Sequence, residues 1–449
     1  MIAAMAATTD ALPKFPPGFL WGVSTSAHQI EGDVAGRRPS VWDAFGAEPG
    51  RIRDGSTADV ACDHVNRYRE DVGLLHDLGV DAYRFSISWP RVLAPGGLDF
   101  YDRLVDELCA RGVRPVPTLF HWDLPLEVEE AGGWLERDTA SRFAAYAATV
   151  AERLGDRVTK WITLNEPAEH TLLGHALGAH APGRKLLFDA LPVAHHQLLG
   201  HGLAAGALRA AGVTDIGIAN SHGPTWPASD SPADAEAADL YDLILNRLFS
   251  DPLLLGRYPD GFGELMPGGD VDADLKTISE STLDWYGINF YQPTRAGAPV
   301  AEDVEFSGLT LPAGLPFSVR PIDGYPVTDF GWPVVPDAFT ELLVSFRDRY
   351  GDRLPPLVVT ENGCAYDGLD DQARIAYLDG HLRALHRAIE AGVDVRGYFH
   401  WSLMDNFEWA EGYTKRFGLV HVDYATGERT PKASYAWLRD ALRAQRARA

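Results

Sequence analysis

Residues 160–167 read KWITLNEP, and this stretch shows the pattern that decides the fold. A short, largely apolar run ends abruptly in the polar pair Asn165 and Glu166. Amphipathic helical stretches precede it at 142–154 and follow it at 193–211. A nearly continuous apolar run is typical of a parallel strand that is buried on both faces. The stretch therefore predicts a strand between two helices, with polar side chains at its carboxyl end.

Seven further runs repeat this pattern: residues 19–24, 81–88, 114–120, 215–220, 284–291, 356–361 and 395–402. Helical periodicity is found between them, at residues 66–78, 101–110, 235–249, 337–349 and around 375–389. Eight strands that alternate with helices predict the α/β class and a single (β/α)₈ TIM barrel. A doubly wound open sheet is the alternative. Such a sheet would need a glycine-rich phosphate turn after an early strand, and the sequence contains neither GxGxxG nor GxxxxGK(S/T).

One barrel accounts for nearly all of the 449 residues. We predict a flexible N-terminal extension over residues 1–14 and the barrel domain over residues 15–446. The stretch 295–329 is rich in Pro and Gly and lies between the sixth and seventh predicted strands. It is too long for an ordinary connection, so we expect a loop at the rim of a site, or a lid over it.

The composition excludes several classes of partner. Lys and Arg number 40 against 63 Asp and Glu, a net charge of −23, which disfavours nucleic acids and anionic membrane surfaces. Three cysteines form no disulfide framework and favour a reducing compartment. Residues 1–9 lack a positive region and a long apolar segment, and no run has transmembrane length. We expect a cytoplasmic protein; its oligomeric state stays open.

Polar and aromatic residues gather where the predicted strands end. In chain order they are Gln29, Arg84, His121, Trp122, Asn165, Glu166, Asn289, Tyr291, Glu361, Asn362 and Trp401. The carboxyl ends of barrel strands form the active-site face. Amides, carboxylates and His bond hydroxyl groups, and Trp covers apolar ring faces, so the set is typical of a sugar site.

Two of these residues are carboxylic acids on strands across the barrel from one another. Glu166 directly follows the fourth predicted strand, residues 160–165, and Glu361 ends the seventh. Cleavage of a glycosidic bond needs such a pair, one to protonate the leaving oxygen and one to act at the anomeric carbon. Taken singly, either residue is as readily interpreted as a salt-bridge partner.

Ordered motifs along nearly the whole chain resemble glycoside hydrolase family 1, the β-glucosidase family. The motifs are FP at 15–16, FLWG at 19–22, QIEG at 29–32, AYRFSISWPR at 82–91, HWDLP at 121–125, TLNEP at 163–167, TENG at 360–363, WSLMDNFEW at 401–409 and KRFGL at 415–419. The resemblance implies a retaining β-glucosidase that releases terminal non-reducing β-D-glucosyl residues from small glycosides and needs no cofactor.

The resemblance also implies a role for each matching residue. Glu166 is the expected acid/base and Glu361 the expected nucleophile, with carboxyl groups about 5–5.5 Å apart as retention requires. Arg84, Tyr291 and Asn289 would support the nucleophile. The expected substrate-binding residues are Gln29, His121, Trp122, Asn165, Trp401, Glu408, Trp409 and Phe417.

Several alternatives stay open on the sequence. A 6-phospho-β-glycosidase typically carries Ser in place of Glu408, and a thioglucosidase Gln in place of Glu166. A non-catalytic sugar-binding barrel commonly lacks one of the two glutamates, whereas transglycosylation uses the same residues. We expect no metal site, since the spacing of His170, His175 and His180 does not place them on one helix face.

The chain departs from the family pattern on the leaving-group side. Ala168 stands where Trp is usual and His28 where Tyr is usual, and the stretches 95–98 and 363–371 look short. We expect Ala168 at the rim, an open site for a large apolar aglycone, and weak preference for cellobiose. Alternatively, an aromatic residue from the 295–329 loop occupies the space that the usual Trp at position 168 would fill. Glucose, galactose and fucose are not distinguished.

Overall fold

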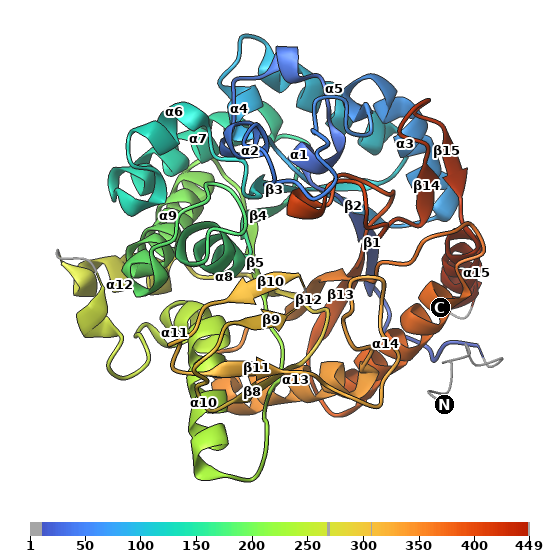
Figure 1. Ribbon diagram of the computed structural model, residues 1–449. Helices are drawn as coiled ribbons and strands as arrows, with labels where there is room; N and C mark the ends of the chain where they lie inside the picture. The colour runs from blue at the N-terminus through green and yellow to red at the C-terminus, as the bar shows by residue number, and fades with distance from the viewer. Residues whose placement is uncertain (1–10, 267–269, 307, 448–449) are drawn as a thin grey trace.

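A closed barrel of eight parallel strands lies at the centre of the computed structural model, which describes residues 11–266, 270–306 and 308–447 (Figure 1). In barrel order the strands are β1 (Leu20–Ser24), β13 (Val395–Trp401), β12 (Leu357–Asn362), β7 (Trp285–Asn289), β5 (Asp215–Ser221), β4 (Lys160–Asn165), β3 (Arg114–Phe120) and β2 (Ala82–Ser86). The predicted barrel is confirmed.

Helices surround the barrel and connect its strands (Figure 1). The longer ones are α3 (His64–Leu78), α5 (Gly97–Ala110), α7 (Asp138–Leu154), α9 (Leu191–Ala210), α10 (Pro232–Asp242), α11 (Leu248–Leu255), α12 (Val271–Glu280), α13 (Pro336–Tyr350), α14 (Gln372–Glu390) and α15 (Ala433–Ala447). Shorter ones are α1 (Ala27–Ile30), α2 (Val41–Gly46), α4 (Trp89–Val92), α6 (Leu126–Glu130) and α8 (Pro167–Glu169). None of the described helices is long and apolar enough to cross a membrane.

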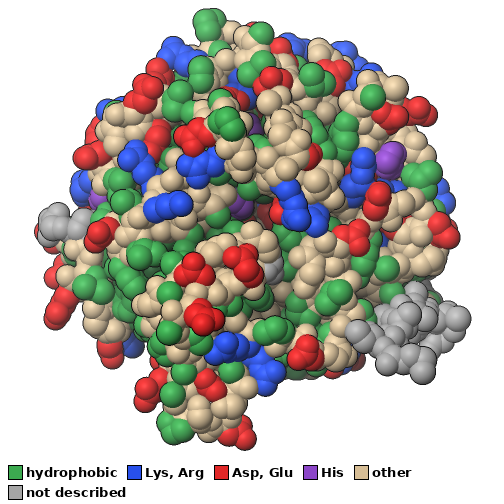
Figure 2. All heavy atoms as spheres, in the orientation of Figure 1, with side chains coloured by type: hydrophobic (Ala, Val, Ile, Leu, Met, Phe, Trp, Pro, Cys, Tyr) green, Lys and Arg blue, Asp and Glu red, His purple; other side chains and the backbone are tan. Residues whose placement is uncertain are grey.

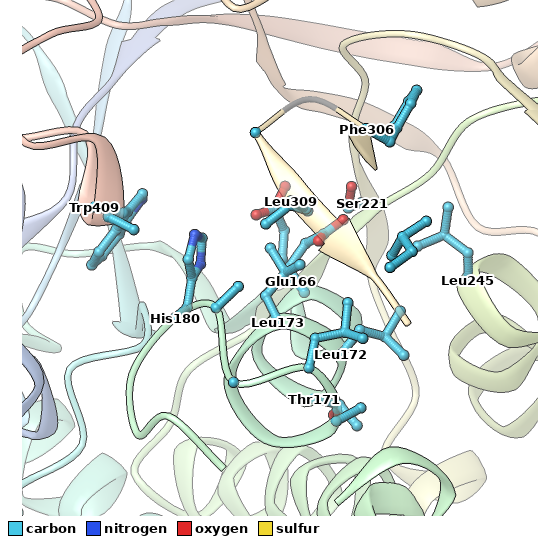
Figure 3. A pocket seen from close by; sticks show the side chains of 18 of the residues that line it. Glu166, Thr171, Leu172, Leu173, His180, Ser221, Leu245, Phe306, Leu309 and Trp409 are labelled. Atoms are coloured by element: carbon cyan, nitrogen blue, oxygen red, sulfur yellow. The ribbon is translucent and has the colours of Figure 1, made fainter. Parts of the chain in front are cut away.

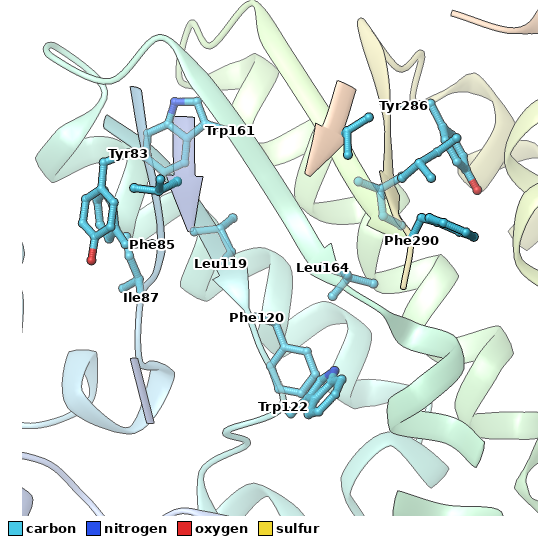
Figure 4. Close-up of a cluster of buried hydrophobic side chains, with 14 of the residues drawn as sticks. Tyr83, Phe85, Ile87, Leu119, Phe120, Trp122, Trp161, Leu164, Tyr286 and Phe290 are labelled. Atoms are coloured by element: carbon cyan, nitrogen blue, oxygen red, sulfur yellow. The ribbon is translucent and has the colours of Figure 1, made fainter. Parts of the chain in front are cut away.

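The barrel interior is filled by side chains. One residue from each strand contributes to a separate buried cluster: Leu20, Ala82, Val116, Ile162, Ala219, Trp285, Val358 and Phe399. Other side chains of the strands and their ends, such as Phe85, Leu119 and Tyr286, belong to the main hydrophobic core (Figure 4). The barrel interior is therefore a packed support and not a pore.

Two connections differ from the sequence-based expectation. The helix predicted over 235–249 is broken, because a π-helical segment, Leu243–Arg247, joins α10 to α11. The 295–329 loop contains the short strands β9 (Val304–Phe306), β10 (Leu309–Leu311) and β11 (Ser318–Arg320). β9 pairs with β10, and β11 pairs with β8 (Thr294–Gly297), which lies beside β6 (Thr225–Pro227). The remaining pair is β14 (Val420–Val422) with β15 (Arg429–Pro431).

Strand register breaks at the carboxyl ends of three strand pairs. The β4–β5 pairing shifts between Ile162 and Asn165, and β12 shifts against both β7 and β13 beyond Val359. Such irregularities re-aim side chains and are common next to active sites. They occur in β4, which Glu166 directly follows, and in β12, which contains Glu361.

Most of the expected N-terminal extension, residues 1–10, lies outside the described residues. The residues that follow lie against the outer helices: Leu12 is buried, Gln445 of α15 donates a hydrogen bond to the carbonyl of Pro13, and the ring of His386 in α14 contacts the carbonyl of Lys14. Figure 2 shows one face of the molecule, with charged side chains of both signs spread over it and hydrophobic side chains gathered beside its centre.

Candidate active site

A pocket of about 760 Å³ lies among the residues that follow the carboxyl ends of the barrel strands. Nine predicted site residues line it: His121, Trp122, Glu166, Tyr291, Glu361, Trp401, Glu408, Trp409 and Phe417. The other four, Gln29, Arg84, Asn165 and Asn289, are hydrogen-bonded to lining residues. The structure thus brings all thirteen together.

Glu361 is held between two donors. The Arg84 guanidinium donates to Oε1 at 2.5 Å and the Tyr291 hydroxyl to Oε2 at 2.7 Å. Both Glu361 and Arg84 are buried, so this ion pair is little screened by water. Burial, and then the charge of Glu361, raises the pKa of Tyr291 well above its usual value, which keeps the phenol a donor. These contacts stabilise an ionised Glu361.

Glu166 has the opposite environment. Asn289 donates to its Oε1 at 2.8 Å and Asn165 to its Oε2 at 3.3 Å, and it has no cationic partner among the described residues. Burial raises the pKa of Glu166 well above its usual value, and the nearby charges of Glu361 and Glu169 raise it further. Its φ of 47° turns the backbone sharply at the end of β4, where α8 begins. Glu166 is therefore set to carry a proton while Glu361 is charged.

A chain of amides connects the two carboxyl groups. Arg84 also donates to Oδ1 of Asn165 at 2.5 Å, and Asn289 donates to the same oxygen at 3.0 Å. These two donors fix the amide of Asn165, so that its Nδ2 faces Nε2 of His121 at 3.0 Å. His121 therefore accepts at Nε2 and carries its proton on Nδ1, which has no partner in the described protein.

Another carboxyl group, Glu408, lies in the same pocket. Gln29 donates to its Oε2 at 3.3 Å. Burial, and then the charges of Glu361 and Glu411, raises the pKa of Glu408 to about 8. Gln29 is itself fixed by bonds to Asn406 Oδ1 at 3.0 Å and the Phe407 carbonyl at 2.9 Å.

Aromatic rings form the walls beside these polar groups. The His121 ring is stacked with Trp401 and with Trp409, with centroids 5.8 Å apart in both pairs. Trp122 contacts Trp409 at 4.7 Å between centroids, and Phe417 packs with Trp401. His28 is stacked on Trp409 with an interplanar angle of 6°. Apolar faces and hydroxyl-bonding groups thus converge, as a sugar ring requires.

Sequence reasoning missed the other side of the pocket. Glu169, Leu172, Leu173, Ser221, Tyr241, Leu245, Phe306, Leu309, Phe317, Phe330 and Trp332 also line it. Figure 3 shows Trp409 and His180 on one side of Glu166, and Leu245 and Phe306 on the other. Phe306 and Phe317 come from the 295–329 loop, whose Pro and Gly content is the one signal that pointed there.

The expectation that Ala168 lies at the rim is wrong. Its side chain is fully buried within the main hydrophobic core and does not line the pocket. Aromatic and aliphatic side chains from the long loop and from the segments after α8 and α10 form the wall instead. In the described part of the chain, no three His, Cys, Asp or Glu side chains are grouped so that they could hold a metal ion.

Residues 12–447 match the sequence profile of glycosyl hydrolase family 1. The chain is 44% identical to a β-glucosidase of Agrobacterium sp., over 94% of each chain. It is also 44% identical to a bifunctional β-D-glucosidase/β-D-fucosidase of Bifidobacterium breve, over 95% of this chain and 97% of that one. A solved structure of a family 1 β-glucosidase from Thermotoga maritima superposes with a TM-score of 0.90 at 39% identity, over 97% and 99% of the two chains.

Proposed function

The chain belongs to glycosyl hydrolase family 1, and on that premise we propose that it is a retaining β-glucosidase with Glu361 as nucleophile and Glu166 as acid/base. The observation that carries the assignment is the contrast between the two carboxyl groups. Glu361 accepts hydrogen bonds from Arg84 and Tyr291, whereas burial and nearby charge raise the pKa of Glu166. Two carboxyl groups with such different environments divide the roles of base and acid.

The first step forms a covalent intermediate. Glu361 attacks the anomeric carbon from the α face, and Glu166 gives its proton to the glycosidic oxygen, so that the aglycone leaves as a neutral alcohol. Glu361 loses its charge in this step, which lowers the pKa of Glu166 and lets Glu166 act next as a base. In the second step Glu166 takes a proton from a water molecule. The water oxygen attacks the same carbon, the bond to Glu361 breaks, and a β-sugar is released.

The remaining predicted residues orient the sugar. Gln29, His121, Asn165, Glu408 and Trp409 bond its hydroxyl groups, Trp401 lies beneath the ring, and Trp122 and Phe417 complete the pocket. The support comes from the free Nδ1 proton of His121 and from the stacked rings around it. No cofactor is needed, because two carboxyl groups and water balance the reaction.

The free cysteines bear on the localisation of the protein, and the two carboxyl groups bear on the competing functions. Cys62, Cys109 and Cys364 are free, which supports our proposal of a reducing compartment such as the cytoplasm. A non-catalytic barrel is disfavoured by the presence of both carboxyl groups in one pocket. Transglycosylation uses the same intermediate, with an alcohol in place of water.

The proposed activity is tested with 4-nitrophenyl β-glycosides that differ only in the sugar. We expect hydrolysis of the β-D-glucoside, and at least about 100-fold lower kcat/KM for its 6-phosphate, because a buried phosphate without a cation costs several kcal/mol. The two lining arginines, Arg51 and Arg53, are already paired with Glu48 and Glu411. A preference for the 6-phosphate would overturn the assignment. The galactoside and fucoside then define the glycone range.

A further inference from the structure

The pocket continues past Glu166 into a largely apolar wall. Leu172 and Leu173 belong to the π-helix His170–Ala176, which follows α8, and Leu245 to the π-helical segment between α10 and α11. Phe306 and Leu309 come from the paired strands β9 and β10 (Figure 3). The whole pocket of about 760 Å³ falls in the range of sites for drug-sized ligands, roughly 300–1,000 Å³. This wall is therefore suited to a large apolar aglycone.

One carboxyl group interrupts this wall. Glu169 is the last residue of α8, three positions after Glu166, and it lines the pocket. Glu169 lies near the acid/base, because its charge is one of the causes that raise the pKa of Glu166. Ser221, at the end of β5, lies close enough to Glu169 for its hydroxyl to oppose the rise in the pKa of Glu169. Tyr241 of α10 also lies near Glu169. Burial, and then the charge of Glu169, raises the pKa of Tyr241 to about 12.

Glu169 has no cation to balance it. Burial raises its pKa, the Ser221 hydroxyl opposes that shift, and among the described residues no Lys or Arg pairs with it. Glu169 is half-buried, and a partly desolvated carboxylate without a cation is costly, because its desolvation is not offset by an opposite charge. A ligand that brings a positive charge would remove that cost.

The rest of the lining carries no spare positive charge. Arg51 and Arg53 are paired with Glu48 and Glu411. Burial lowers the pKa of His180 and His222 to about 4 and that of His121 well below its usual value, so these histidines carry no charge at pH 7. The net charge of the described lining residues is therefore negative, which complements a cationic ligand.

We propose that Glu169 determines specificity for the leaving group: the pocket selects glycosides whose aglycone is a large apolar group that carries a protonated amine, and the amine pairs with the Glu169 carboxylate. The aglycone body packs on the leucines and phenylalanines of the wall. This inference rests on the proposed glucosidase function, because it assigns the side of the pocket beyond the scissile bond.

The test uses two substrates that differ only in charge, 6-aminomethyl-2-naphthyl and 6-methyl-2-naphthyl β-D-glucoside, at pH 6.5. We expect the kcat/KM ratio of amine to methyl substrate to be about 10 or more in the parent, as a charge-assisted hydrogen bond allows. In Glu169→Gln the ratio falls to about 1. Any effect of Glu169 on the pKa of Glu166 acts on both substrates and cancels in the ratio.

Glu411→Gln is the matched control, since Glu411 also lines the pocket but its charge is already paired with Arg53. Its ratio should stay within about twofold of the parent's. A parent ratio near 1, an unchanged ratio in Glu169→Gln or an equal fall in Glu411→Gln would each overturn the proposal. Hydrolysis of 4-nitrophenyl β-D-glucoside by the parent separates this failure from failure of the glucosidase function. If that substrate is cleaved and neither naphthyl glucoside is, the apolar wall does not receive a large aglycone.

Discussion

Glu361→Ala is expected to lower kcat for 4-nitrophenyl β-D-glucoside on the order of 10⁴-fold or more, because the covalent intermediate can no longer form. Azide should restore part of the rate. The small anion fits the space that the carboxylate leaves, and it attacks the anomeric carbon from the α face. The product of this rescue is therefore α-D-glucosyl azide, which NMR distinguishes from the β-anomer.

The control for this variant is Tyr291→Phe, which keeps Glu361 and removes only the hydroxyl that bonds its Oε2. It should lose activity to a smaller extent, on the order of 10–100-fold for one hydrogen bond to a charged group, and azide should not rescue it. A Glu361→Ala protein that keeps more than a few per cent of the activity, or that forms β-D-glucosyl azide, would contradict the assignment.

Glu166→Ala should affect substrates according to their leaving group. Loss of kcat/KM should reach roughly 10²–10⁴-fold for cellobiose, whose leaving sugar needs a proton. For 2,4-dinitrophenyl β-D-glucoside, whose phenolate leaves unaided, the first step should be nearly unchanged. Azide should now give the β-D-glucosyl product, since it attacks the intermediate on Glu361 from the face that water uses.

The pH profile adds a second readout of Glu166. Burial and the charge of Glu361 raise its pKa, so the acid form persists to a higher pH than in an ordinary glutamic acid and is lost as the pH rises through that raised value. The parent's kcat/KM for cellobiose should therefore fall on the alkaline side, and Glu166→Ala should lack this limb. Equal losses for both leaving groups, with the alkaline limb retained, would show that another residue is the acid.

The barrel could be predicted because its strands are locally encoded. The run before Asn165 is apolar enough to be buried on both faces, and its predicted bounds, 160–165, agree with β4. The convergence of the site residues followed from one rule, that parallel strands of a barrel end on the same side. Glu166 and Glu361, far apart in the chain, were thereby predicted to share a pocket, as they do.

The leaving-group side could not be predicted, since it depends on contacts between distant segments. Ala168 was expected at the rim because it follows Glu166 closely, but the sharp turn at Glu166 and the start of α8 bury it. Glu169 gave no signal of its own, because its environment is made by Ser221 and Tyr241, which come from other elements. The strands β9 and β10 are three residues each, too short for a detectable alternation.

The central claim, double displacement through Glu361, is tested most directly by ¹H NMR of the sugar that forms first from 4-nitrophenyl β-D-glucoside. Two successive inversions at the anomeric carbon return it to its starting configuration, so β-D-glucose should appear first and the α-anomer should follow only at the rate of mutarotation. First release of α-D-glucose would mean that water attacks the substrate directly, and it would contradict the role of Glu361 as nucleophile.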